Sequence, residues 1–349
     1  MSPPPRPPRR PRPSQDEPLL SIRGLTVAMP GRERPVTVVK DLDLEIGRGE
    51  SLGLVGESGC GKTTTLLSVL GLLPRGAQVL AGEIRFDGRD LLSLRPRARR
   101  AVLGAQIGVI WQDPLAALDP VMRVGEQIAE SVRAHSRADR GEARRRAHEL
   151  MRLVELPDVE RLARAYPHEL SGGQRQRVVI ATAIASEPML LLADEPTTAL
   201  DVTVQDQVLA LLGRLRAELG LALMLVSHDL AVVGETCDRV CIMYAGRIVE
   251  AGASGEVFAA PRHRYSAGLL AAAPDIGHPG VRPHGIPGIP PAGAALDACA
   301  FAPRCPAADE LCRGQLPVLA GRAGRVAACH HPIGAVAHAD EEPAAIPHG

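Results

Sequence analysis

The sequence predicts an α/β fold with a largely parallel sheet, an antiparallel β layer, an inserted helical subdomain and a small cysteine-rich C-terminal extension. Apolar strand-like segments alternate with helical segments between residues 51 and 229, an order that favours a parallel sheet covered on both faces. Residues 19–29 and 36–46 instead alternate apolar and polar side chains, which is typical of an antiparallel layer. Cysteines cluster between residues 299 and 329, after a segment rich in Pro and Gly.

The elements follow one another in a simple order. "SLGLVG" is a short strand that enters a glycine-rich loop, and "KTTTLLSVLGLL" continues as a helix. Residues 114–166 are helical in pattern and rich in arginine. "MLLLAD" and "LALMLVSHD" are buried strands on either side of a helix over residues 202–219, and "RVCIMYAGRIVEAG" is a hairpin that turns at Ala245 and Gly246.

These patterns divide the chain into four parts. We predict a disordered Pro/Arg-rich tail at 1–18, a main domain at 19–273 with a helical subdomain at about 114–172, a C-terminal extension at 274–331 and a disordered tail at 332–349. Positive and negative side chains balance at 40 each, with a pI near 7.2, so no nucleic-acid partner is expected. No apolar run reaches the roughly 20 residues that cross a bilayer.

A phosphate-binding loop lies between the first apolar strand and its helix. "GESGCGKTT" fits the pattern G-x-x-x-x-G-K-[ST] in the strand–loop–helix context that this motif requires. Backbone amides cradle phosphates there, the lysine reaches the β- and γ-phosphates, and the following hydroxyl can bind Mg²⁺. The expected nucleotide-binding residues are Gly56, Glu57, Ser58, Gly59, Cys60, Gly61, Lys62, Thr63 and Thr64.

Two carboxylates lie at the end of the apolar strand "MLLLAD": Asp194 is its last residue, and Glu195 comes next. Asp194 is expected at the mouth of the phosphate loop, where it would hold Mg²⁺ together with Thr63. Glu195 is expected to continue the strand with its side chain pointing away from that of Asp194. It would then lie beyond the γ-phosphate and deprotonate an attacking water.

A second anion site is expected in "ELSGGQRQR". Ser171, Gly172, Gly173 and Gln174 open a helix-like run, and a hydroxyl with bare amides at a helix N-terminus favours an anion. One nucleotide does not need two cradles from one subunit. We therefore expect this segment to cap the γ-phosphate held by a partner subunit, although a simple helix cap would explain Ser171 equally well if the segment stood alone.

Taken in order, "GESGCGKTT", "WQDP", "LSGGQ", "LLLADEP", "TALD" and "SHD" resemble the nucleotide-binding subunit of an ABC transporter. The resemblance implies an ABC ATPase core over residues 19–274. It implies that Gln112 contacts Mg²⁺ and the attacking water, and relays the nucleotide state to a membrane subunit. It also implies that His228 contacts the γ-phosphate and orients Glu195, and that Asp201 lies at the seam between two subunits.

Longer stretches resemble the ATPase subunits of dipeptide/oligopeptide importers, among them "YPHELSGGQRQRVVIATAIASEPMLLLADEPTTALDVTVQ" and the ending "CAFAPRCPAADELC". The resemblance implies ATP hydrolysis that powers peptide uptake through two transmembrane permease subunits, with a second, distinct ATPase chain and an extracytoplasmic substrate-binding protein. The chain would lie peripherally on the cytoplasmic face of the cell (inner) membrane. A nickel or other small-solute importer ATPase is the alternative, and a soluble ABC ATPase outside transport is a further one.

The late cysteines have the spacing C-x5-C-x6-C-x16-C, formed by Cys299, Cys305, Cys312 and Cys329. Four thiolates can bind Zn²⁺ or hold an iron–sulfur cluster, and thiols without a metal are the third interpretation. The family resemblance favours a [4Fe–4S] cluster. His330 and His331 are possible substitute ligands.

The sequence departs from the family at two positions. An aromatic residue usually precedes the second strand to stack on adenine, and here Met29 and Pro30 stand in that region, which puts nucleotide affinity and base selectivity in doubt. Cys60 occupies a loop position where Ser is common. We expect this thiol to make the ATPase sensitive to thiol reagents.

Overall fold

The computed structural model describes residues 17–31, 33–198, 200–272, 285–291, 297–322 and 324–334. Residues 1–16 and 335–349 of the predicted tails, and much of the Pro/Gly-rich segment after residue 274, lie outside the described residues. The domain boundaries given above therefore remain predictions.

A four-stranded antiparallel sheet forms the first layer. Its strand order is β2-β1-β4-β5, and β1 pairs with β2 so that Ile22 faces Leu44 and Leu25 faces Leu42. These four side chains are fully buried, because alternation along both strands places the apolar residues on the same face. The predicted antiparallel layer is confirmed. Its strands are β1 (Leu20–Met29), β2 (Val36–Ile46), β4 (Gln78–Phe86) and β5 (Arg89–Asp90).

The second sheet has eight strands in the order β11-β12-β10-β9-β3-β8-β7-β6. The run from β9 to β6 is parallel and the other pairs are antiparallel, as the predicted hairpin over 239–252 requires. Its strands are β3 (Ser51–Val55), β6 (Ile107–Ile110), β7 (Leu190–Asp194), β8 (Ala222–Ser227), β9 (Arg239–Tyr244), β10 (Arg247–Ala253), β11 (Ala320–Arg322) and β12 (Arg325–Ala327).

The register of the parallel strands places the functional loops together. Val55 pairs with Ser227, and Asp194 pairs with Val226, so β3, β7 and β8 end at the same level of one sheet edge. The phosphate loop, Glu195 and His228 follow directly after these strands. Local hydrophobic patterning thereby brings three separate motifs to one place.

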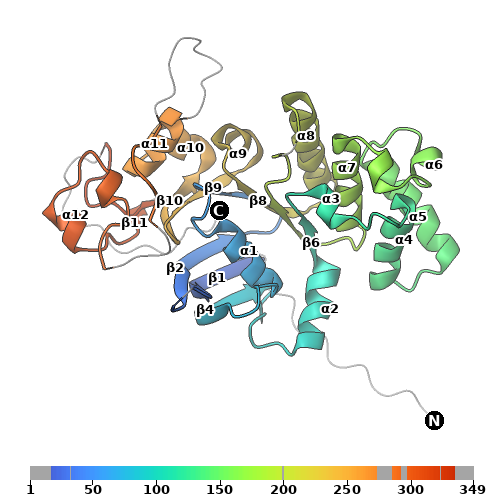
Figure 1. The fold of residues 1–349 in the computed structure, drawn as a ribbon, viewed down its shortest axis with the longest axis horizontal. Coiled ribbons are helices and arrows are strands. Elements are labelled where there is room, and N and C mark those ends of the chain that lie inside the picture. The colour runs from blue at the N-terminus through green and yellow to red at the C-terminus, as the bar shows by residue number, and fades with distance from the viewer. Residues whose placement is uncertain are drawn as a thin grey trace.

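Helices flank the large sheet and extend from it. In Figure 1, α4 to α7 gather at one end of the molecule, and α12 and β11 lie at the opposite end. Among the described residues, no helix is both long and apolar enough to cross a bilayer. The helices are α1 (Lys62–Leu70), α2 (Pro96–Gln106), α3 (Pro114–Ala117), α4 (Val124–His135), α5 (Arg140–Leu153), α6 (Val159–Leu162), α7 (Gly172–Ala183), α8 (Val202–Leu219), α9 (Leu230–Thr236), α10 (Ser254–Ala259), α11 (Arg264–Ala272) and α12 (Glu310–Gly314), with short 3₁₀ turns η1 (Pro167–Glu169) and η2 (Ala302–Arg304).

The C-terminal extension joins the main sheet. Strand β12 pairs with β10, with Glu250 opposite Ala327 and Ala251 opposite Val326. Val326 is buried in the same hydrophobic cluster as β1 and β3, and Phe301 is buried in the other main cluster. The extension therefore shares the core of the α/β domain, a contact that sequence reasoning did not foresee.

Candidate functional site

The glycine-rich loop encloses a cavity at the carboxyl edge of the parallel strands. Gly59 and Gly61 have φ values of 81° and 111°, which side chains with a Cβ rarely adopt, so the loop can curl tightly before α1 begins. The cavity has a volume of about 500 Å³. Its lining comprises Val38, Ser58, Gly59, Gly61, Lys62, Thr63, Thr64, Gln112, Glu195 and His228.

The side chain of Lys62 is buried and hydrogen-bonds to the phosphate loop itself. Its Nζ donates hydrogen bonds to the carbonyl oxygens of Gly56 at 2.6 Å and Glu57 at 3.1 Å. Glu57 itself does not line the cavity, and its backbone N–H donates to the hydroxyl of Tyr265 at 2.9 Å. Of the loop residues predicted to bind nucleotide, Gly56, Glu57 and Cys60 do not line the cavity.

Thr63 and Asp194 form a pair of oxygen donors beside the cavity. The Thr63 hydroxyl donates to Asp194 Oδ1 at 3.3 Å, and the carboxylate is only 5% exposed at the end of β7. Burial raises the pKa of Asp194 above its ordinary value, while the Thr63 hydrogen bond opposes that shift. A hydroxyl and a carboxylate are ligands that Mg²⁺ prefers, so this pair fits the predicted metal position.

Three side chains converge on one oxygen of Glu195, and two of them donate hydrogen bonds to it. Its Oε2 lies 3.0 Å from Gln112 Nε2, 3.0 Å from the Thr198 hydroxyl and 3.3 Å from His228 Nδ1. The predicted proximity of His228 to this carboxylate is therefore found, and Gln112, which was expected to contact Mg²⁺ and the attacking water, also lies against it. Thr198 was missed by sequence reasoning, although a hydroxyl three residues after a predicted base was a signal that could have suggested it.

The expected strand geometry at Glu195 is wrong. Strand β7 ends at Asp194, and Glu195 has φ of 46°, in the left-handed region that a non-glycine residue seldom adopts. The backbone turn, anchored by the Glu195 N–H on the Val226 carbonyl at 2.9 Å, sets the direction of the carboxylate. Such strain occurs where the surrounding structure overrides the backbone preference, as it commonly does at active sites.

The second anion segment lies away from this cavity. Ser171 caps α7: its Oγ accepts from the Gln174 N–H at 3.3 Å, and the Gln174 side chain accepts from the Ser171 N–H at 3.1 Å. Asp201 caps α8 in the same way, accepting from Val204 at 3.0 Å. None of the residues 171–174 or Asp201 lines the cavity, so one chain does not bring the two predicted phosphate sites together.

The sequence departures have structural counterparts. Met29 and Pro30 do not line the cavity, and Val38 on β2 does so instead. Cys60 is only 6% exposed, and burial raises the pKa of its thiol. Because the thiolate is the reactive form, the expected sensitivity of Cys60 to thiol reagents is not supported by its surroundings.

The four late cysteines lie close enough to one another to influence each other's ionisation. Burial is the main cause that raises the pKa values of Cys299, Cys312 and Cys329, and neighbouring cysteines of the same set add to each shift. The backbone reinforces the cluster, since the Cys299 N–H donates to the Cys312 carbonyl at 3.0 Å. The thiols therefore share one environment, as their sequence clustering predicted.

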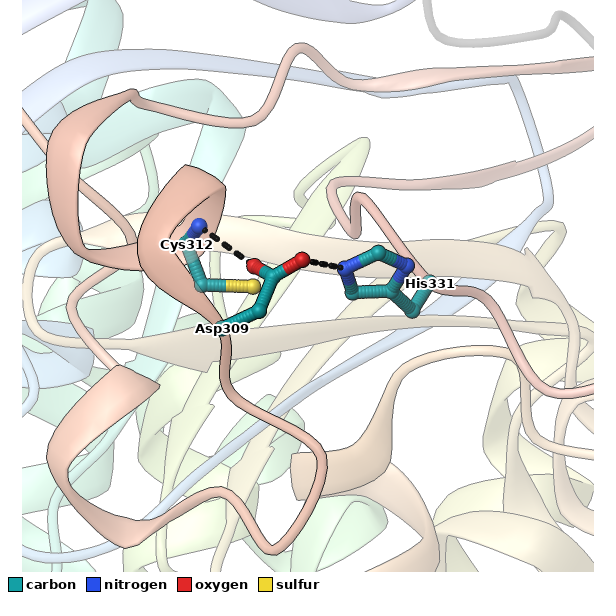
Figure 2. Close-up of side chains that lie close together, drawn as sticks. All are labelled: Asp309, Cys312 and His331. Carbon is teal, nitrogen blue, oxygen red and sulfur yellow. Dashed lines mark hydrogen bonds and ion pairs between the residues drawn. The ribbon is translucent and has the colours of Figure 1, made fainter.

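A tighter group of possible metal ligands involves only one of these thiols. Among the described residues, ligand atoms of Asp309, Cys312 and His331 all lie within 4.8 Å of one another, as Figure 2 shows. Asp309 accepts from the Cys312 N–H at 2.9 Å and pairs with His331 Nε2 at 2.9 Å. Sequence reasoning named His331 but missed Asp309, which also caps α12.

Comparison with known families gives two matches along the chain. Residues 39–198 match the ABC transporter family, and residues 249–312 match the C-terminal region of oligopeptide/dipeptide transporters. The first match holds the cavity residues except Val38 and His228, and the second holds three of the four clustered cysteines.

Curated proteins match over about nine-tenths of the chain. A probable peptide ABC transporter ATP-binding protein, y4tR of Sinorhizobium fredii, is 48% identical over 89% of this chain and 94% of its own length. The oligopeptide transport ATP-binding protein OppD of Salmonella typhimurium is 43% identical over 90% and 94%. Among solved structures, a dimeric post-hydrolysis state of the ATP-binding cassette MJ0796, bound to ADP and Pi, is 29% identical with a TM-score of 0.61, over 67% of this chain and 98% of that one.

Proposed function

The chain belongs to the oligopeptide/dipeptide family of ABC transporter ATP-binding proteins, and from that membership we propose that it hydrolyses ATP to power the uptake of dipeptides and oligopeptides. The observation that carries the proposal is the convergence of Gln112, Thr198 and His228 on one carboxylate oxygen of Glu195 at the rim of the cavity. Such a carboxylate is held ready to accept a proton from water.

The roles of the site residues follow from their positions. Lys62 would exchange the loop carbonyls for β- and γ-phosphate oxygens, and Thr63 with Asp194 would hold Mg²⁺, which neutralises charge on the phosphates. Glu195 takes a proton from the attacking water, whose oxygen bonds to the γ-phosphorus. The bond from that phosphorus to the bridging oxygen breaks, and the products are ADP and inorganic phosphate. Gln112 and His228 orient the base and the water.

A second cassette would complete the site. Ser171, Gly172, Gly173, Gln174 and Asp201 lie outside the chain's own cavity but at exposed or half-buried helix N-termini, where a partner's γ-phosphate could be capped. The dimeric state of the similar cassette supports this arrangement. We propose that the second cassette is a distinct ATPase chain.

The membrane partners would be two permease subunits, supplied with cargo by an extracytoplasmic substrate-binding protein. The segment after Gln112 presents the exposed apolar side chains of Leu115 and Val121, which are 48% and 82% exposed. We propose that the permease covers this segment, which would link the Gln112 contact with Glu195 to the membrane. The chain would then be peripheral on the cytoplasmic face of the cell membrane.

No three of the clustered thiols come as close together as the ligands of one tetrahedral zinc ion would, within the part of the chain that the structure describes. A zinc–sulfur bond of about 2.3 Å would bring tetrahedral sulfurs to about 3.8 Å from one another. In the described residues no three of these four sulfurs lie mutually within 4.8 Å. We propose a [4Fe–4S] cluster held by Cys299, Cys305, Cys312 and Cys329, which would cross-link the extension. Zinc, either on these thiols or on the group formed by Asp309, Cys312 and His331, is the alternative that metal analysis of anaerobically purified protein would reveal.

One experiment tests the transport proposal directly. The complex with its permeases is purified from host membranes and reconstituted, and its ATPase rate is measured with binding protein and a panel of peptides and nickel. Stimulation by peptides is expected. Stimulation by nickel alone would move the assignment to the nickel importers, and co-purification with soluble nucleoprotein instead of permeases would refute a transport role.

A further inference from the structure

The C-terminal extension contacts the phosphate loop through one buried arginine. Arg304 Nη1 lies 2.6 Å from Glu57 Oε2, and Nη2 lies 3.0 Å from Oε1, so the guanidinium meets both carboxylate oxygens. The Arg304 side chain is 4% exposed and the Glu57 side chain 26%. Two-point pairs of this kind are geometrically specific as well as strong.

The rest of the guanidinium is anchored in the extension and the sheet. Its Nε donates to the Pro287 carbonyl at 2.9 Å, and Nη2 also donates to the Ile286 carbonyl at 3.2 Å. Its carbon lies 5.9 Å from the ring centroid of Tyr244. With every nitrogen engaged, Arg304 has a fixed position and fixes the carboxylate that it binds.

An aromatic group beneath the loop holds the same segment. In a chain with 2% aromatic residues, Phe301 packs against Tyr244 and Tyr265 with ring centroids 5.4 Å and 5.5 Å away. Tyr265 in turn accepts the backbone N–H of Glu57. The segment between Cys299 and Cys305 is therefore connected to Glu57 in two ways. Arg304 contacts the Glu57 carboxylate, and Phe301 packs on Tyr265, which accepts the Glu57 N–H.

Glu57 connects this contact to the phosphate-binding lysine. Its carbonyl oxygen accepts a hydrogen bond from Lys62 Nζ at 3.1 Å, and also from the Cys60 N–H at 3.3 Å. A shift of Glu57 would move the carbonyl that positions Lys62 and the backbone that forms the cavity wall. Small displacements in a packed loop of this kind change how well preorganised donors meet their ligand.

We propose that Arg304 is a positioning residue of the nucleotide site, through which the cysteine-bearing extension sets the affinity of the phosphate loop for nucleotide. This rests on the proposed nucleotide binding by the cavity. Because Arg304 directly precedes Cys305, the fold of the cysteine cluster controls whether the guanidinium reaches Glu57. The extension thereby regulates the cassette in the same chain, in addition to any role in assembly.

The test compares Arg304→Ala with wild type in the full-length, permease-bound complex. The KM for ATP is expected to rise at least about tenfold, equivalent to about 1.4 kcal/mol. Because Arg304 touches none of the groups around Glu195, kcat should stay within about threefold. A purely structural role would lower the active fraction and kcat while leaving KM unchanged. Arg313→Ala, which removes an exposed arginine of the same extension, is the matched control and should change neither parameter.

A cycle with Glu57→Ala tests whether the two residues act together. The double variant is expected to bind ATP no more than about twofold worse than either single variant, because both remove the same interaction. Arg304→Lys keeps the charge without the two-point fork and should give an intermediate KM, and it serves if the alanine variant does not fold.

Hydrogen exchange gives a readout independent of turnover. Coupling between two sites is reciprocal, so a non-hydrolysable ATP analogue should slow amide exchange across residues 299–305 in wild type but not in Arg304→Ala. An unchanged KM in a folded Arg304→Ala protein, or additive effects in the cycle, would overturn the inference. If wild type itself binds no nucleotide, the proposed function fails instead.

Discussion

Replacement of Glu195 by Gln is the most direct test of the reaction geometry. The substitution keeps the size of the side chain but replaces the carboxylate, which can accept a proton, with an amide that cannot. Gln112, Thr198 and His228 now converge on one carboxylate oxygen, and the amide would retain a single oxygen for them. ATP binding should persist, because Lys62, Thr63 and Asp194 are untouched.

The expected loss is set by the contribution of a general base, about 10²- to 10⁴-fold in rate. At about 1.4 kcal/mol per factor of ten, that corresponds to a barrier raised by about 2.8–5.6 kcal/mol. Thr198→Val removes the hydroxyl that donates to Glu195. It should raise the activation free energy of hydrolysis by about 0.5–1.5 kcal/mol, the usual contribution of one hydrogen bond.

Phosphate release in a single-turnover experiment on the complex measures both variants, and size-exclusion chromatography with ATP shows whether Glu195→Gln accumulates as a closed dimer. Single-turnover hydrolysis by Glu195→Gln within tenfold of wild type would refute the assignment of Glu195 as the base. A larger effect of Thr198→Val than of Glu195→Gln would show that the hydroxyl, rather than the carboxylate, governs the step.

Three further predictions concern buried groups. Burial raises the pKa of Asp194, so its ionisation disfavours the folded state as pH rises above the ordinary value of 3.8. Asp194→Asn should therefore raise the Tm of the nucleotide-free protein at pH 7.5 and abolish the further rise with Mg²⁺ and ATP; a lower nucleotide-free Tm would contradict this. Burial lowers the pKa of His263 from 6.5 to about 4, so between these pH values the unfolded chain binds a proton that the folded chain does not. The free energy of unfolding therefore falls as the pH falls from 6.5 towards 4, by up to about 1.4 kcal/mol per pH unit. Denaturant titrations should show a shallower decline for His263→Asn, and equal slopes would argue against a neutral buried imidazole. Finally, peptide mapping after brief maleimide treatment should find Cys60 unmodified in the native chain and modified in urea, whereas rapid native labelling would show that the loop opens.

The catalytic motifs were predictable because each is short and contiguous. The phosphate loop, the strand ending at Asp194 and the segment at Ser171 carry their chemistry in neighbouring residues, and strand and helix periods place them at element ends. The two β layers and the hairpin at Ala245 and Gly246 followed from the same local patterns.

Contacts between distant residues were beyond these patterns. Glu195 turns away from the strand with a positive φ just after its N–H bonds to the Val226 carbonyl of the neighbouring strand, and the contact with its hydroxyl donor Thr198 depends on that turn. Cys60 looked accessible as a loop residue but is covered on folding. Val38 lines the cavity, whereas Met29 and Pro30 at the end of the first strand do not.

The sequence by itself determined the chemistry, since a phosphate loop, two carboxylates and a second anion segment are encoded within a few residues each. Only the tertiary structure decided how the C-terminal extension meets that chemistry. Arg304 and Glu57 are 247 residues apart in the sequence. Strand β12 likewise pairs with β10, which is distant from it along the chain. Local propensity carries no information about such pairings, because they form only when separate elements have packed onto one core.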